Sequence, residues 1–212
     1  SIPAKPSISK FYNNEYNKNQ LLSLFSQNFD PVETLLNWQI DSITLEIYEK
    51  VKGYFCSLIK NQTACRKIQT CMKKTEPFII KRIFYEILPD LQYLITNAYG
   101  NYFCQKLYSS ITYSEKLCFL KSLNNNILMI ANDGIGTYPL QAIIEKLQTN
   151  EEIHIIIEAL RNEKTLYLIS KDAYGVHVIE KVITCFPEEC IFFIYDYILN
   201  NFANFSNQST GL

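Results

Sequence analysis

The stretch Asn97-Ala-Tyr-Gly-Asn-Tyr-Phe-Cys-Gln105 recurs along the chain in altered form, and this recurrence predicts a repeat protein. Three further stretches share its pattern: Asn61 to Gln69, Asp133 to Gln141, and Asp172 to Glu180. Each motif begins with Asn or Asp, has Gly or Ala three residues later, and ends with Gln or Glu at the ninth position. The small residues are 36, 36 and 39 residues apart, and Gly211 follows after another 36. A period of this length is typical of stacked helical repeats.

Each motif predicts the start of a helix. The leading Asn or Asp can accept hydrogen bonds from free backbone N–H groups. The Gly or Ala lets the backbone approach a neighbouring helix closely. Apolar residues then follow at helical spacing, most clearly at Val178, Ile179, Val182 and Ile183.

Amphipathic segments between the motifs predict further helices, at Phe78–Leu88, Ser114–Leu123, Glu151–Leu160 and Glu188–Leu199. Two or three helices per repeat, none able to bury its apolar face alone, predict an all-α solenoid. Residues 1–40 do not fit the repeat, and we expect residues 20–38 to form an N-terminal helical cap. Residues 41–212 are expected to hold about four complete repeats, with a fifth that begins near Gly211 and is cut off.

The composition predicts a folded protein, because 48% of the residues are hydrophobic and 19% are charged. The net charge of −1 argues against a protein that coats polyanions mainly through charge. The charge is uneven, however: residues 1–106 hold 13 Lys or Arg and 9 Asp or Glu, and residues 107–212 hold 7 and 12. A nucleic acid could therefore still follow a locally positive face.

The sequence gives little support for a metal-binding protein, a membrane protein or an enzyme. The seven cysteines form no C-x-x-C pair and there are two histidines, so we expect no metal or cofactor and mostly buried thiols. No apolar run approaches 18 residues, which predicts a soluble, intracellular protein without a membrane partner. No phosphate-binding glycine loop or nucleophile elbow occurs, and Glu151 and Glu152 fit the charged first turn of a helix. We therefore expect neither an enzyme nor a small-molecule substrate.

The polar side of each motif helix has a repeated arrangement. The fifth and ninth motif positions lie one turn apart on one face, and the sixth stands beside them. The outer pairs are Cys65 and Gln69, Asn101 and Gln105, Thr137 and Gln141, and Val176 and Glu180. The sixth position always holds a flat side chain: Arg66, Tyr102, Tyr138 or His177.

Flat side chains in a row form a platform on which bases can stack, at roughly 1–3 kcal/mol per base. The outer pairs can form hydrogen bonds with base edges. In one repeat, a solvated helix face explains these residues equally well. Four repeats in register favour recognition of single-stranded RNA, base by base.

These residues resemble the repeats of the Pumilio/PUF family. The clearest matches run from Phe84 to Leu107 and from Asp172 to Lys181, and the resemblance covers about residues 41–212. It implies a crescent whose concave face binds single-stranded RNA in antiparallel orientation, one base per repeat.

The resemblance also implies a role for each outer pair. Cys65 with Gln69 would read adenine, and Asn101 with Gln105 would read uracil. Thr137 with Gln141 would read adenine, with Thr where Cys or Ser is usual. Glu180 can accept from guanine, but Val176 lacks the expected hydroxyl, which leaves this base unassigned.

The four repeats would then read an unassigned base followed by a 3′-terminal AUA, which is similar to the 3′ half of the family element UGUANAUA, and later repeats would read the UGUA half. The family implies a cytoplasmic regulator that binds mRNA 3′ untranslated regions and represses them through partners such as deadenylase complexes. Two alternatives remain open. A protein-binding solenoid of the HEAT or armadillo type explains the helices but not the row of flat side chains. A nucleolar relative in ribosome biogenesis fits less well with the near-neutral charge.

Overall fold

A computed structural model describes residues 29–201 of the 212-residue chain. Every regular element in this range is a helix, which confirms the all-α class. The α-helices are α2 (Pro31–Asn37), α3 (Leu45–Val51), α4 (Phe55–Lys60), α5 (Gln62–Cys71), α6 (Pro77–Ile87), α7 (Leu91–Ile95), α8 (Gly100–Tyr108), α9 (Tyr113–Asn124), α10 (Ile127–Ala131), α11 (Thr137–Ile144), α12 (Asn150–Leu160), α13 (Glu163–Lys171), α14 (Gly175–Cys185) and α15 (Glu188–Asn200). Two 3-10 helices, η2 (Met72–Lys74) and η3 (Leu88–Asp90), follow α5 and α6.

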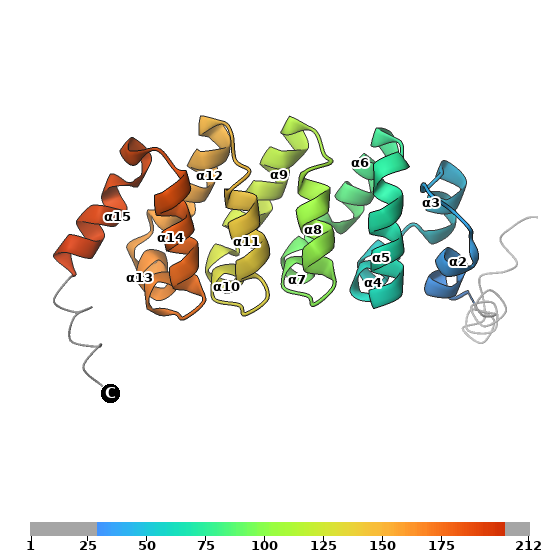
Figure 1. Cartoon of the computed structure of the whole chain (residues 1–212), viewed down its shortest axis with the longest axis horizontal. Coiled ribbons are helices and arrows are strands. Elements are labelled where there is room, and N and C mark those ends of the chain that lie inside the picture. The colour runs from blue at the N-terminus through green and yellow to red at the C-terminus, as the bar shows by residue number, and fades with distance from the viewer. Residues whose placement is uncertain (1–28, 202–212) are drawn as a thin grey trace, which may run out of the picture.

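The helices form units of three that stack side by side along the long axis of the molecule (Figure 1). We number the units from the N-terminus: α4–α5–α6, α7–α8–α9, α10–α11–α12 and α13–α14–α15. The middle helices α5, α8, α11 and α14 pack against one another in a row, and α9, α12 and α15 pack in a second row. Each unit packs against the next in one continuous array, so the predicted solenoid is confirmed.

The motif glycines lie where two helices of one unit approach most closely. A Cβ atom on Gly100 would lie 2.5 Å from the carbonyl oxygen of Leu94 in α7. The same contact would be 2.8 Å for Gly136 and 2.5 Å for Gly175. Because these distances are too short for a side chain, glycine is required at all three positions. Ala64 takes this place in the first unit and is buried.

The motif Asn and Asp residues accept hydrogen bonds as predicted. Asn97 Oδ1 accepts from the backbone N–H groups of Tyr99 and Gly100, both at 3.0 Å. Asn61, Asp133 and Asp172 accept from the equivalent pairs of N–H groups. In the second, third and fourth units this capped turn precedes the helix, and in the first it leads directly into α5.

The predicted helices between the motifs correspond to α6, α9, α12 and α15, within one residue at each end. The helices α9 and α12 begin with a capping box, formed by Thr112 with Glu115 and by Thr149 with Glu152. The carboxylate therefore reaches back to the backbone, and both glutamates are buried. The expectation of a charged first turn holds for both Glu151 and Glu152: Glu151 is exposed, and Glu152 is buried in the capping box.

The apolar stripes of the motif helices form the core, with Phe103, Cys104 and Leu107 fully buried in α8. All seven cysteines are free: Cys65, Cys71 and Cys104 are buried, Cys56, Cys118 and Cys190 are half-buried, and Cys185 is exposed. The expectation that most thiols are buried is thus only partly right. Burial raises the pKa of the Cys65 thiol, and burial with a hydrogen bond to Asp90 raises the pKa of Cys56 to about 12.

At the N-terminal end, α2 packs against α3 and α5. Lys67 of α5 donates to the carbonyl oxygens of Leu36 and Trp38, which holds the end of α2 on the first unit. Residues 20–28 of the expected cap lie outside the described residues, as does Gly211 of the expected fifth repeat. The division at residue 40 therefore stays a prediction. No helix between residues 29 and 201 is both long and apolar enough to cross a membrane.

Candidate nucleic-acid interface

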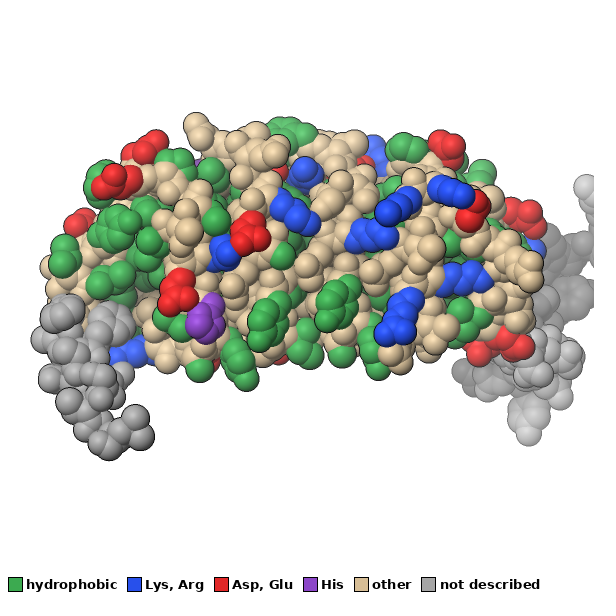
Figure 2. Space-filling view, viewed as in Figure 1, with side chains coloured by type: hydrophobic (Ala, Val, Ile, Leu, Met, Phe, Trp, Pro, Cys, Tyr) green, Lys and Arg blue, Asp and Glu red, His purple; other side chains and the backbone are tan. Residues whose placement is uncertain are grey.

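A row of flat, exposed side chains crosses the middle helices. Tyr102 is 63% exposed and Tyr138 is 66% exposed, and Arg66 and His177 are exposed at the equivalent positions. We call the surface of α5, α8, α11 and α14 that bears these four side chains the motif face. In Figure 2 a purple histidine, two green side chains and a blue one follow one another across it. Rings this exposed within a well-packed row of helices are available to a ligand.

The fifth motif positions lie beneath this row. Cys65 and Thr137 are each 1% exposed and Asn101 is 6% exposed, whereas Val176 is half-buried. The ninth positions are more accessible, since Gln69, Gln105 and Gln141 are half-buried and Glu180 is exposed. The ninth position is therefore better placed to reach a base than the fifth.

In the first three units the structure brings the fifth and ninth positions together. Gln141 Nε2 donates to Thr137 Oγ1 at 2.9 Å. Gln69 Nε2 donates to Cys65 Sγ at 3.2 Å, and Gln105 Nε2 to Asn101 Oδ1 at 3.5 Å. This contact fixes the direction of each amide, which has a carbonyl oxygen and a second N–H besides. Such an amide can donate to and accept from one base edge.

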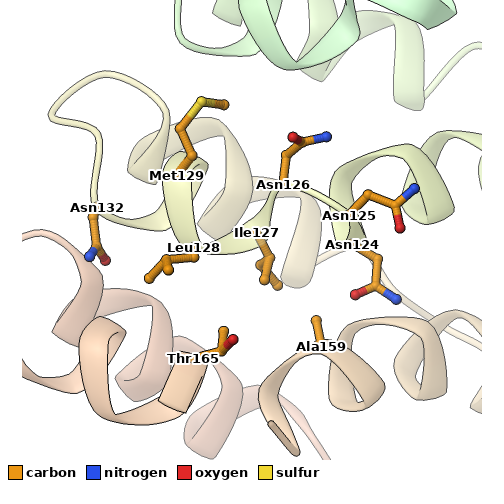
Figure 3. Close-up of a pocket in the computed structure, with 9 residues that line it drawn as sticks. All are labelled: Asn124, Asn125, Asn126, Ile127, Leu128, Met129, Asn132, Ala159 and Thr165. Carbon is orange, nitrogen blue, oxygen red and sulfur yellow. The ribbon is translucent and has the colours of Figure 1, made fainter.

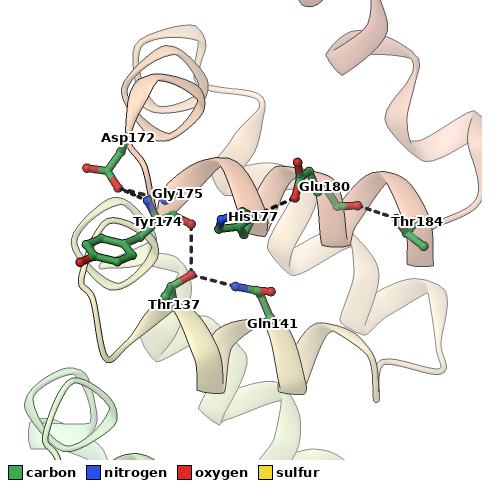
Figure 4. A network of polar contacts seen from close by, with 8 residues as sticks. All are labelled: Thr137, Gln141, Asp172, Tyr174, Gly175, His177, Glu180 and Thr184. Atoms are coloured by element: carbon green, nitrogen blue, oxygen red, sulfur yellow. Dashed lines mark hydrogen bonds and ion pairs between the residues drawn. The ribbon is translucent and has the colours of Figure 1, made fainter.

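The fifth position also links neighbouring units, which the sequence did not reveal. Thr137 Oγ1 donates to the carbonyl oxygen of Tyr174 at 3.2 Å (Figure 4). Cys65 Sγ makes the same contact with the carbonyl oxygen of Tyr99 at 3.4 Å. Both acceptors lie in the turn before the next motif helix. Asn101 instead donates to carbonyl oxygens of its own unit, at residues 97 and 98.

The fourth unit is different. His177 Nδ1 and Glu180 Oε2 are 2.8 Å apart, so the carboxylate pairs with the flat residue and not with the fifth position (Figure 4). Val176 has no polar atom to offer a base or the carboxylate. The interface at this unit is therefore built from His177 and Glu180.

Outside the motif face, the described residues form no candidate metal site, and the hollow shown in Figure 3 holds none of the predicted base-reading residues. No cluster of three or more His, Cys, Asp or Glu residues suited to a metal ion occurs between residues 29 and 201. An open hollow lies between the segment from α9 to α10 and the helices α12 and α13, lined by Asn124, Asn125, Asn126, Ile127, Leu128, Met129, Asn132, Ala159 and Thr165 (Figure 3). These residues come from α9, α10, α12, α13 and the turns beside them, so the hollow includes no predicted base-reading residue.

The repeat geometry matches a known family. The model of the Pumilio-family RNA binding repeat matches residues 54–88, 92–120 and 166–199. These ranges contain the motif helices of the first, second and fourth units. The third unit, where the motif reads Gly-Thr-Tyr-Pro and the next spacing is longer, lies outside them.

Relatives and solved structures agree with this match. The Pumilio domain-containing protein C6G9.14 of Schizosaccharomyces pombe is 31% identical over 183 residues, which are 86% of this chain and 26% of that protein. The RNA-binding domain of yeast Puf5p bound to AAT2 RNA aligns with a TM-score of 0.63 and 27% identity, over 68% of this chain and 41% of that one. The Puf4 RNA binding domain bound to an HO endonuclease RNA 3′ UTR recognition sequence aligns with a TM-score of 0.64 and 30% identity. The alignment covers 70% of this chain and 45% of that one.

The fold and the motif face together define an α-solenoid built from repeats of an RNA-binding type. The chain belongs to the Pumilio/PUF family. It spans about a quarter of the Schizosaccharomyces pombe relative and less than half of each of the two solved domains.

Proposed function

We propose that this chain binds single-stranded RNA along the motif face, with one base at each unit. The observation that supports this most strongly is the exposed flat side chain in every unit, placed beside a position that can form hydrogen bonds. Each base would stack between flat side chains of successive units, while a Gln or Glu reaches its edge.

The base assignments rest on the resemblance to Pumilio/PUF repeats, and they are supported by the contact between the fifth and ninth positions in the first three units. Cys65 with Gln69 reads adenine, Asn101 with Gln105 reads uracil, and Thr137 with Gln141 reads adenine. With the RNA antiparallel to the chain, these units read the 3′-terminal AUA of an element similar to UGUANAUA. The fourth unit, with Val176 and a Glu180 that pairs with His177, has no assigned base.

The proposed cellular role is repression of mRNAs through their 3′ untranslated regions, in the cytoplasm and with a deadenylase or another repressor as protein partner. It is supported by the similarity to the Puf4 domain, whose structure contains a 3′ UTR recognition sequence. The same proposal expects no catalytic activity, because the motif face offers stacking and hydrogen-bonding groups without a candidate nucleophile.

Fluorescence anisotropy with labelled UGUAAAUA RNA tests the proposal. A matched RNA in which the final AUA is changed to CCC serves as control, at physiological salt. We expect tighter binding of the first RNA. Equal binding of both would favour a non-specific nucleolar relative. No binding to either, with a peptide captured on the motif face, would favour a protein-binding solenoid.

A further inference from the structure

Charge is unevenly distributed along the motif face. On this face and the segments that directly follow its helices, the first two units hold five basic residues: Arg66, Lys67, Lys73, Lys74 and Lys106. In the third and fourth units two lysines are balanced by two glutamates: Lys146, Lys181, Glu145 and Glu180. Figure 2 shows the result as blue side chains gathered towards the end of the row formed by α5 and η2.

The basic residues of the first unit follow one line on the helix. Arg66 and Lys73 are seven residues apart, or about two helical turns, so they point to the same side. Gln69 lies between them, and η2 continues directly from α5. Lys73 therefore extends the line that begins at a flat residue and passes the base-reading amide.

Lys106 of the second unit approaches the same line from α8. Its Nζ donates to the backbone carbonyl oxygen of Gln69. An ammonium group thus lies beside the first unit's base-reading residue. Lys67 is not part of the proposed surface, because its Nζ donates to two carbonyl oxygens at the end of α2 and so points away from Gln69, whereas Lys106 donates to one carbonyl oxygen, that of Gln69 itself.

Acidic partners differ between the two halves of the motif face. Lys181 pairs with Glu145 in the second half, and Glu180 adds another carboxylate. In the first half Lys74 pairs with Asp41, and both side chains are about two-thirds exposed or more. Exposed ion pairs are weak and exchange readily with other anions. Lys74 is therefore available to a phosphate.

We propose that Arg66, Lys73, Lys74 and Lys106 form a phosphate-binding surface for the RNA strand that leaves the first unit towards its 3′ end. This rests on the proposed function, because antiparallel binding places the 3′ end at the first unit. Nucleotides 3′ of the AUA then add affinity through their phosphates and add no base specificity. Because the basic residues lie at the first unit, the 3′ flank of the RNA adds to the affinity and the 5′ flank does not.

Abasic extensions separate this surface from base reading, because they add phosphates without bases. We would compare UGUAAAUA RNA alone with the same RNA carrying a short abasic extension at its 3′ end or at its 5′ end. The expected result is tighter binding of the 3′-extended RNA only, with a gain that shrinks as salt rises. Equal gain from both extensions, or no gain from either, would overturn the inference. Discrimination between AUA and CCC cores remains a separate test of the proposed function.

A double variant, Lys73→Gln with Lys74→Gln, assigns the gain to these residues. Each phosphate contact on a single strand contributes ~0.7 to the salt slope, so losing two leaves a slope smaller by ~1.4. When salt rises from about 50 to about 200 mM, the wild-type affinity for the 3′-extended RNA should fall about sevenfold more than the variant's. The matched control, Lys121→Gln with Lys164→Gln, changes two exposed lysines of α9 and α13 and should behave as wild type.

A loss of affinity in the double lysine variant could also arise from misfolding. A variant that gains affinity excludes this explanation. Asp41→Asn removes the carboxylate that pairs with Lys74. It should therefore increase the effect of the 3′ extension and leave the affinity for unextended RNA nearly unchanged. If the 3′ gain persisted in the double lysine variant and did not respond to Asp41→Asn, the surface would be assigned wrongly.

Discussion

Gly100, Gly136 and Gly175 are the residues at which the smallest change would have the largest effect on the units. Each faces a backbone carbonyl oxygen at a distance that no side chain tolerates. A backbone atom, unlike the end of a flexible side chain, cannot move without shifting its helix. The position therefore sets how closely the first two helices of a unit pack.

Gly100→Ala should lower the free energy of unfolding by roughly 1–3 kcal/mol, because the new methyl group forces α7 and α8 apart. Urea denaturation followed by circular dichroism measures the change. Ala98→Ser adds an atom at an exposed position of the same turn and should have little effect. An unchanged midpoint for Gly100→Ala would mean that the units pack more loosely than described.

Gln69→Ala should weaken binding chiefly to RNA that carries adenine at the first unit's position. The variant removes an amide held by Cys65, and a hydrogen bond of this kind contributes about 1 kcal/mol. Anisotropy with RNAs that differ at that base measures the loss. Gln148→Ala, an exposed glutamine away from the motif face, is the control. Equal weakening for every base would contradict readout by Gln69.

At the scale of the element, α12 shows how a buried carboxylate can stabilise a helix start. Glu152 is 2% exposed and accepts from the backbone N–H groups of Gln148 and Thr149, each at 3.0 Å. It also accepts from the hydroxyl of Tyr108 in α8 at 2.9 Å. Burial alone would raise its pKa, but these hydrogen bonds hold the pKa of Glu152 below its usual value. The charged form is therefore the one that the fold stabilises.

The contribution of Glu152 to the free energy of unfolding should decrease as the pH falls. Because its folded pKa is lowered, the stabilisation is fully present above the ordinary pKa of about 4.3 and is lost as pH falls through the folded value. Glu152→Gln should thus be less stable than wild type at neutral pH, and the difference should shrink below about pH 4. Urea unfolding over this range is the measurement. Glu189→Gln, at an exposed place in the first turn of α15, should show no comparable trend.

The sequence predicted the long elements well and the short ones poorly. The amphipathic pattern placed α6, α9 and α12 within one residue, and the structure shows Pro77 and two capping boxes at their starts. The helices α7 and α10 have five residues each, too few to show a helical period. The spacing of Asn101 and Thr137 predicted their face correctly. Their burial depends on the packed turns around them, which spacing within one repeat does not encode.

At the scale of the whole molecule, the described residues form a row of units, so the protection of each helix depends on the units beside it. The helices α8 and α11 have a unit on both sides. In contrast, α15 leaves Phe192 54% exposed and Leu199 72% exposed. Stability in such a row should decrease from its centre outwards.

Hydrogen exchange should therefore be slowest in α8 and α11 and faster in α15. Backbone amides of α15 should open with fewer contacts to break, since α15 packs against α12 and α14 and has no further described unit beyond it. Mass spectrometry of peptides from the three helices measures the difference. Equal protection throughout would show that the chain opens as a single cooperative block.

The hydroxyl of Thr137 and the thiol of Cys65 each join a predicted base-reading position to the backbone of the following unit. A substitution designed to change the preferred base at one of these positions also removes or replaces a hydrogen bond between adjacent units. The rigidity of the packing between units and the base preference therefore depend on the same residues. A recoded variant should be judged on how readily it flexes as well as on which base it prefers.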